Sequence, residues 1–196
     1  MLSAEDEVAL DATIRTIAES HGYVSNLMQT LALAPQGLAA FAALSGYTRY
    51  GSQLTPLQRE LAIIIAVRDV HYGWTHHEPL ARAAGVTQEQ LLLIREGRVP
   101  RDLAAAEHAL CDYAFEISAA RRLPPRVAEA MHENFSPRQI VDIALLTSFS
   151  ITAAALALAL EVPIEPPETL QFEFDWQQNV LNGHPPERSP APTDAH

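Results

Sequence analysis

Proton transfer is the chemistry that residues 59–84 could support. Glu60 is followed by a wholly apolar run of residues, and three of the chain's eight histidines come soon after it, at His71, His76 and His77. A carboxylate in an apolar helix loses water, so we expect the pKa of Glu60 to rise towards neutrality. Imidazoles titrate in the same range. The segment therefore predicts an acid–base site that needs no cofactor.

Helical spacing separates the two adjacent histidines. On a helix, His77 shares a core-like face with Trp74, so we expect it to point inward, whereas His76 shares its face with Tyr72. Pro79 requires this helix either to begin about four residues before the proline or to begin earlier and bend. Both arrangements place His77 near a helix end or a bend.

Structural interpretations of the same residues remain open. A buried Glu60 also fits an ion pair with Arg59, Arg68 or a neighbouring helix. An inward His77 also fits a hydrogen-bonded residue of the core.

Metal and thiol chemistry have weaker support. His71, His76, His77 and Glu78 offer enough ligands, but the spacing fits no zinc motif and adjacent helical residues do not easily chelate one ion. We therefore predict no metal and no cofactor. The single cysteine, Cys111, fits a small buried apolar residue better than a reactive thiol.

Composition narrows the classes of partner. The 196 residues carry a formal net charge of −11, which argues against the basic surface that a nucleic-acid partner requires. The chain has no lysine, so Schiff-base catalysis by a lysine side chain is excluded. Its first residues lack the cationic and apolar regions of a signal peptide, and we expect a cytoplasmic protein that acts on a small molecule.

One segment tests for a membrane span. Residues 140–160 are mostly apolar, but they include Asp142 and many alanines. Alanine contributes little insertion energy, and an aspartate inside a bilayer is costly. The pattern favours a helix buried in the domain or in an oligomer, with no membrane partner.

The remaining pattern predicts an all-α domain over residues 1–162. Capping boxes mark three helix starts, at Thr55, Thr87 and Ser136. Gly85 and Gly97 lie where helix C-caps belong.

The C-terminal part follows a different pattern. Aromatic residues alternate with polar ones between Gln171 and Trp176, as in a strand. We therefore expect residues 163–182 to form an extended arm and residues 183–196 to be disordered.

The segment from Leu54 to Gly97 resembles the carboxymuconolactone decarboxylase family, which includes the AhpD-like alkylhydroperoxidases. The family pattern has an Arg-Glu pair opening an apolar helix, a Tyr-x-Trp-x-x-His turn, and a helix of small residues that ends in glycine. Here these are Arg59-Glu60, Tyr72 to His77, and Ala81–Gly85. The resemblance extends over roughly residues 35–162.

This resemblance implies an AhpD-like helical fold and a homo-oligomer, either a trimer or a hexamer, with sites between helices. It also implies a cofactor-independent lyase that acts on a small carboxylated lactone or a related anion. His77 would stabilise or protonate the enolate-like intermediate, and Glu60 would hold its tautomer. Tyr72 would donate a hydrogen bond.

Other residues would bind the substrate. Trp74 and His76 would line the pocket beside Tyr72. Arg68 would bind the substrate carboxylate, with Arg59 as a second candidate.

Two positions depart from the family pattern. In the peroxidase branch a CxxC pair precedes the histidine, and the aligned residues here are Val70 and Gly73. In the decarboxylase branch a glutamate usually occupies the position of Gly73. Another proton transfer on a small carbonyl compound, a peroxidase-like activity and a non-catalytic ligand-binding oligomer are the alternatives.

Overall fold

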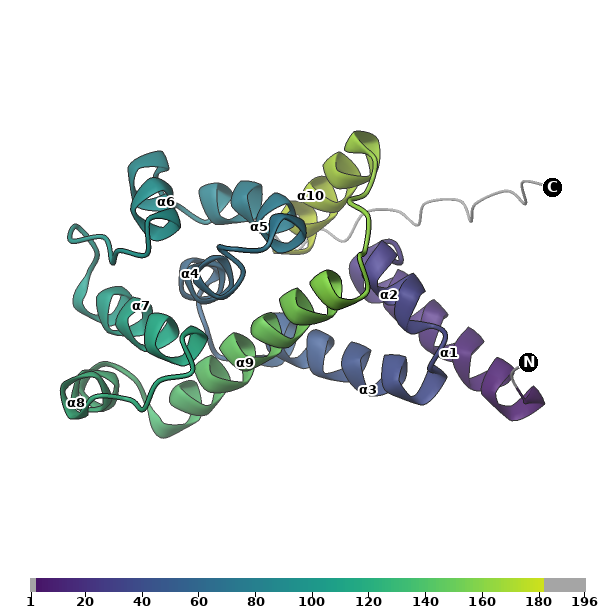
Figure 1. Cartoon of the computed structure of the whole chain (residues 1–196), viewed down its shortest axis with the longest axis horizontal. Helices are drawn as coiled ribbons and strands as arrows, with labels where there is room; N and C mark the ends of the chain where they lie inside the picture. Colours follow the sequence, from purple (N-terminus) through teal and green to yellow (C-terminus); the bar gives the residue numbers. More distant parts are fainter. Residues whose placement is uncertain (1–2, 182–196) are drawn as a thin grey trace. The chain divides into compact units, whose positions relative to one another are not determined.

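The structure is a computed structural model that describes residues 3–181. These residues form helices and connecting turns, with no strand among them, so the predicted all-α fold is confirmed (Figure 1). The helices are α1 (Ala4–His21), α2 (Asn26–Leu31), α3 (Pro35–Gly46), the π-helix η1 (Tyr47–Gly51), α4 (Pro56–Ala66), α5 (His71–Ala83), α6 (Gln88–Arg95), α7 (Ala105–Ser118), α8 (Pro125–Asn134), α9 (Pro137–Ala159) and α10 (Pro167–Leu181).

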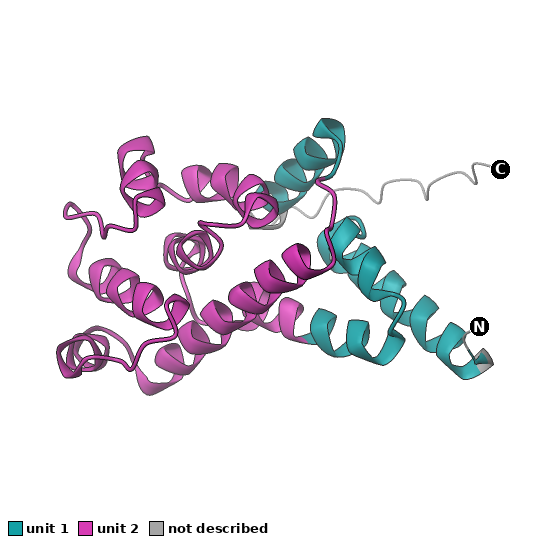
Figure 2. Ribbon diagram, in the orientation of Figure 1, with its two compact units in different colours: residues 1–43, 165–196 teal, residues 44–164 magenta. Residues whose placement is uncertain are grey.

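The chain divides into two compact units (Figure 2). Unit 1 combines residues 1–43 with residues 165–196, and unit 2 comprises residues 44–164. The boundary falls inside α3. All of the predicted site residues belong to unit 2.

The local signals at helix ends are confirmed. Thr55, Thr87 and Ser136 each accept a hydrogen bond from the backbone N–H three residues later, and the glutamine at that position bonds back to the cap. Gly85 and Gly97 have φ angles of +108° and +76°, which suit glycine after a helix end. Each reciprocal cap satisfies two backbone donors that a helix start leaves open.

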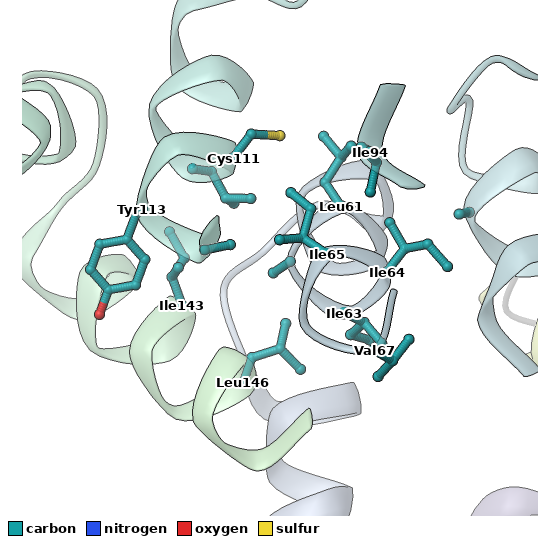
Figure 3. Close-up of a cluster of buried hydrophobic side chains, with 14 of the residues drawn as sticks. Leu61, Ile63, Ile64, Ile65, Val67, Ile94, Cys111, Tyr113, Ile143 and Leu146 are labelled. Atoms are coloured by element: carbon teal, nitrogen blue, oxygen red, sulfur yellow. The ribbon is translucent and has the colours of Figure 1, made fainter. Parts of the chain in front are cut away.

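Helix α4 lies at the centre of unit 2. It packs against α5, α7 and α9, and Leu61, Ile64 and Ile65 are fully buried between them (Figures 1 and 3). Because α4 is apolar on nearly all sides, it is enclosed by neighbours instead of facing water along one side. Any polar side chain on this helix is therefore held inside the unit.

Helix α9 is long and apolar enough to cross a membrane by its length and composition alone. The core helix of a water-exposed protein passes the same test, and Asp142, Ile143 and Leu146 are buried in unit 2. Val141 and Leu145, however, are 53% and 37% exposed. Within this chain one face of α9 is therefore buried, as predicted, and the other face is exposed.

Unit 1 corrects the prediction of an extended arm. Residues 167–181 form helix α10, which packs on α1. The aromatic residues were read with a period of two, but Phe172 and Trp176 are also one helical turn apart, and their ring centroids lie 6.2 Å from each other. The indole N–H of Trp176 donates to the carbonyl of Ser20 on α1. The predicted disordered tail, residues 183–196, lies outside the described residues.

Candidate acid–base site on α4 and α5

Glu60 and His77 form a buried pair between two neighbouring helices. Glu60 lies on the second turn of α4, His77 lies in the middle of α5, and Nδ1 of His77 is 3.0 Å from Oε2 of Glu60. The side chains are 5% and 15% exposed. The structure therefore brings together the two residues that the sequence predicted as the acid–base couple.

The predicted direction of the Glu60 pKa is wrong. Burial favours the neutral carboxyl, but the hydrogen bond and charge of His77, together with the charges of Arg49 and Arg59, hold the pKa below its usual value. The predicted rise in pKa followed from the apolar run alone and did not include the combined effect of these three basic groups, of which Arg49 was not foreseen. Glu60 is thus a carboxylate at neutral pH, suited to orienting an imidazole instead of shuttling a proton itself.

The pairing assigns a tautomer to His77. An ionised Glu60 only accepts hydrogen bonds, so Nδ1 of His77 carries the proton that it donates. Nε2 is then the reactive nitrogen, and it lies 3.5 Å from Nη2 of Arg49 on η1. An imidazole held in this way by a carboxylate can accept a proton at Nε2 and release it again.

Sequence reasoning missed Arg49. It lies in a π-helix that no sequence pattern marked, 28 residues before His77. Single-turn π-helices are often found at functional sites. The sequence shows an arginine at position 49, but it does not show that this arginine contacts His77.

Arg59 contacts the same group of residues. Its Nη1 donates to the backbone carbonyl of Arg49 at 3.1 Å, and its Nε lies 3.8 Å from Oε1 of Glu60. Arg59 is only 5% exposed, yet its Nε and Nη2 have no hydrogen-bond partner. Burial lowers the pKa of this guanidinium, and the nearby Glu60 opposes that effect.

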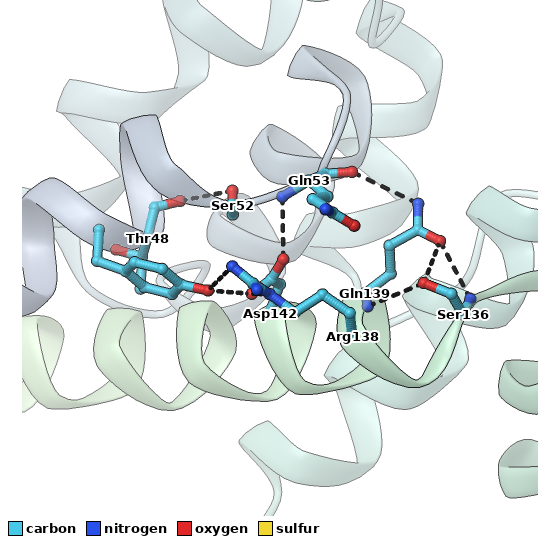
Figure 4. A network of polar contacts seen from close by, with 8 residues as sticks. Thr48, Ser52, Gln53, Ser136, Arg138, Gln139 and Asp142 are labelled. Atoms are coloured by element: carbon cyan, nitrogen blue, oxygen red, sulfur yellow. Dashed lines mark hydrogen bonds and ion pairs between the residues drawn. The ribbon is translucent and has the colours of Figure 1, made fainter.

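Asp142 ties η1 to helix α9 (Figure 4). Its carboxylate is fully buried and accepts hydrogen bonds from the hydroxyl of Tyr47, the backbone N–H of Gln53 and Nε of Arg138. Burial alone would raise the pKa of Asp142, but these donors hold it below the usual value. The segment on both sides of Arg49 is thereby held by one side chain.

We expect Asp142→Asn to lower the free energy of unfolding by about 1–2 kcal/mol, because an amide cannot accept from all three donors. A carboxyl whose pKa is depressed stabilises the fold above its unfolded pKa of about 3.8, and this contribution is lost as the pH falls further. Urea unfolding at several pH values should thus show a constant deficit from pH 5 to 7 that shrinks below pH 4. Asp69→Asn, at an exposed ion pair with Arg68, is the matched control and should have no measurable effect.

The other predicted site residues are placed differently. The rings of Tyr72 and His76 lie 4.5 Å apart on α5, and His76 is buried. Trp74 packs under Arg95 of α6, with 4.2 Å between the guanidinium carbon and the ring centroid.

Arg68 lies in the turn after α4. Its guanidinium stacks over Phe115 at 5.2 Å and pairs with Asp69 at 3.1 Å. None of its described contacts involves Glu60 or His77. Of the two arginines predicted to bind a substrate carboxylate, the structure brings only Arg59 to the acid–base pair.

Gly73 lies one turn before His77 on α5, where the chain passes very close to Val67. A Cβ atom at position 73 would lie 2.6 Å from Cβ of Val67 and 2.9 Å from its Cγ1. The family's cysteine or glutamate at this position therefore has no room here. The departure seen in the sequence is a steric feature of the short turn between α4 and α5.

The described residues place no thiol at the acid–base pair and form no cluster of metal ligands. Cys111 is fully buried in the core of unit 2, and burial raises the pKa of its thiol. Among residues 3–181, no three His, Cys, Asp or Glu side chains are arranged to hold a metal ion.

The structure is an all-helical domain with an AhpD-like fold and a buried Glu–His pair between two of its helices. Residues 35–116 match the family model of the carboxymuconolactone decarboxylase family, and this segment includes Glu60 and His77. The match covers less than half of the chain and agrees with the family resemblance seen in its sequence. None of the curated proteins compared with the chain matches it.

Solved structures with the same fold include a debrominase and peroxidase-related proteins. The debrominase Bmp8 is 20% identical with a TM-score of 0.65, covering 88% of this chain and 95% of its own. A peroxidase-related protein from Silicibacter sp. TM1040 is 21% identical with a TM-score of 0.65, covering 86% and 89%. A protein with an alkylhydroperoxidase AhpD core from Ralstonia eutropha JMP134 is 20% identical with the same score, covering 87% and 93%. At these identities the similarity concerns the fold.

Proposed function

We propose that this protein is a cofactor-independent lyase of the carboxymuconolactone decarboxylase type, acting on a small carboxylated lactone or a related anion. The observation that carries the proposal is the 3.0 Å contact between Nδ1 of His77 and Oε2 of Glu60 inside unit 2. The buried carboxylate fixes the tautomer of the imidazole, and the imidazole can then transfer a proton to carbon.

In the proposed reaction, the bond between the ring carbon and the departing carboxylate breaks. Its electron pair moves into the unsaturated lactone, carbon dioxide leaves, and an enolate-like anion remains. His77, protonated at Nε2, donates a proton to carbon and takes a replacement from water. Glu60 stabilises the imidazolium through Nδ1–H, and the adjacent guanidinium of Arg49 favours the enolate's negative charge.

Thiol chemistry has less support in this chain. The debrominase Bmp8 was also solved as a cysteine-to-alanine variant in complex with 2,3,4-tribromopyrrole, at 20% identity to this chain. Here the single cysteine is buried in the core, and Val67 occupies the space beside Gly73 where a second thiol would lie. This favours proton transfer over a peroxidase-like reaction.

Purified protein incubated with γ-carboxymuconolactone, a chelator and no thiol is expected to release carbon dioxide. Parallel samples should receive an organic hydroperoxide with dithiothreitol, or 2,3,4-tribromopyrrole with dithiothreitol. Turnover only in a thiol-containing sample would contradict the proposal, and so would binding of the lactone without any reaction.

Cys111→Ala is expected to keep the full decarboxylase rate, because the thiol lies in the core and not at the acid–base pair. Truncating this side chain should reduce stability slightly, by about 1 kcal/mol. Steady-state kinetics beside a urea unfolding curve would check both parts. A loss of kcat in a well-folded Cys111→Ala protein would mean that the thiol takes part in the reaction.

A homo-oligomer, trimeric or hexameric, and a cytoplasmic location belong to the same proposal. Sedimentation velocity of the purified protein would measure the oligomeric state.

A further inference from the structure

We propose that Asp142 is a positioning residue for the reaction, acting through Arg49: it fixes η1, and η1 holds the guanidinium of Arg49 beside the reactive nitrogen of His77. None of the contacts described for Asp142 involves Glu60 or His77. The inference rests on the proposed function in one respect only, that a proton is transferred at Nε2 of His77.

Both ends of η1 are bound by the carboxylate of Asp142 (Figure 4). Oδ1 accepts a hydrogen bond from the hydroxyl of Tyr47, the first residue of η1, at 2.5 Å. Oδ2 accepts a hydrogen bond from the backbone N–H of Gln53, just after the end of η1, at 2.9 Å. Asp142 is fully buried, so water does not compete for these bonds. Arg49 lies between the two points of attachment.

Tyr47 is held by further contacts. Besides donating to Asp142, its hydroxyl accepts from Nη2 of Arg138 at 2.7 Å, and Nε of Arg138 bonds to the same oxygen of Asp142 at 3.1 Å. The ring of Tyr47 lies close to the backbone at Gly51, where an added Cβ would be 3.0 Å from its Cδ2. This side chain therefore spans η1 from its first residue to its last, and its bond to Asp142 ties the whole turn to α9.

The residue that η1 brings to the acid–base pair is Arg49. Nη2 of Arg49 lies 3.5 Å from Nε2 of His77, and the backbone carbonyl of Arg49 accepts from Nη1 of Arg59 at 3.1 Å. π-Helices are rare because their backbone geometry is less favourable than that of an α-helix, so the shape of η1 depends on contacts with its neighbours. Helix α9 therefore helps to set the position of Arg49 through Asp142.

Small displacements of Arg49 should matter for the reaction. A group that moves by about 1 Å near the reacting atoms can lower the rate by about 100-fold. In the proposed reaction Arg49 favours the enolate's negative charge, and this electrostatic effect falls with distance. Loosening η1 should thus slow the chemical step while the contact between Glu60 and His77 stays in place.

Steady-state kinetics in a double-mutant cycle of Arg49 and Asp142 would test the inference. Asp142→Asn is expected to lower kcat roughly 10- to 100-fold with a much smaller change in KM, and Arg49→Met to lower kcat by about 100-fold. Because Asp142 acts through Arg49, Asp142→Asn should have little further effect in the Arg49→Met background. A general loss of folded protein would instead lower the rate equally in both backgrounds.

Tyr47→Phe is the milder variant, because it removes one hydroxyl and keeps the other two bonds of Asp142. It should fold like wild type and lose part of the rate, again only when Arg49 is present. Tyr113→Phe makes the same change in the core of unit 2, on α7, and should keep the wild-type kcat.

The imidazole nitrogens of His77 test the inference without any substrate. Long-range nitrogen–proton NMR correlations report the chemical shift of each ring nitrogen, and the signals of His77 are identified by their absence in His77→Gln. Asp142→Asn and Arg49→Met are expected to move the Nε2 signal in the same direction, whereas Tyr113→Phe should leave it unchanged. Because this measurement needs no turnover, it separates the inference from the proposed function.

The inference would be overturned by a wild-type kcat in Asp142→Asn, or by a loss of the same factor with and without Arg49, since Asp142 would then be a structural residue only. An Nε2 signal of His77 that does not move in Asp142→Asn would also overturn it. A moved signal in a protein that does not turn over the lactone would contradict the proposed function and still support the hold of Asp142 on Arg49.

Discussion

His77→Gln is expected to lower kcat for decarboxylation by about 100- to 10,000-fold, because general acid–base catalysis by a positioned side chain contributes that much. Glutamine occupies a similar volume and can still bond to Glu60, but it cannot carry a proton to carbon. The rate of carbon dioxide release under substrate saturation is the measurement. His132→Gln, at an exposed histidine near the end of α8, is the control and should retain the wild-type rate.

Glu60→Gln should also reduce kcat, since an amide no longer stabilises a positive charge on His77. The Glu60 pKa is held below its ordinary value of 4.5 by the basic groups around it. The carboxylate is therefore ionised throughout the range above pH 4.5, and the rate of the wild type should show no step there from Glu60. An undiminished rate in both the Glu60 and the His77 variants would mean that the catalytic groups lie elsewhere.

Gly73→Ala is expected to destabilise the protein by roughly 2–3 kcal/mol, because the new Cβ would overlap Val67 in a packed interior. A loss of stability would be informative, because alanine inside a helix without such a contact is about 1 kcal/mol more favourable than glycine. Gly46→Ala is the matched control. A Cβ at Gly46 meets nothing within 4 Å, so this variant should be neutral or more stable.

A double-mutant cycle with Val67→Gly would assign the Gly73 effect to this one contact. Val67→Gly removes the three atoms nearest to the new Cβ, so Gly73→Ala should cost much less in that background. Urea unfolding curves of the four proteins give the coupling free energy. A cost for Gly73→Ala that is the same in both backgrounds would show that the close approach of α5 to Val67 is not the cause.

The helical framework could be read from the sequence because its signals are local. The caps at Thr55, Thr87 and Ser136 depend on residues three apart, and the apolar run after Glu60 marks a core helix whatever surrounds it. The C-terminal arm was misread because a period of two and a helical turn share the positions Phe172 and Trp176. A short alternating pattern does not distinguish these structures.

The site was predictable only in part, because some of its residues lie far apart in the sequence and meet only in the folded chain. Glu60 and His77 could be proposed as partners because the family resemblance implied that Glu60 holds the tautomer of His77. Arg49 could not be placed, because it reaches His77 from a π-helix that is held by Asp142, far along the chain. The same limitation reversed the predicted direction of the Glu60 pKa. Burial could be inferred from neighbours in sequence, whereas two of the three compensating groups, His77 and Arg49, are brought to Glu60 by the fold.

The most direct test of the central claim, that Glu60 and His77 act as one acid–base unit, is kcat for Glu60→Gln, His77→Gln and the double variant. Residues that work as a unit lose their effect together, so the double variant is expected to be no slower than His77→Gln alone. Losses that multiply in the double variant, as for two independent groups, would contradict the account.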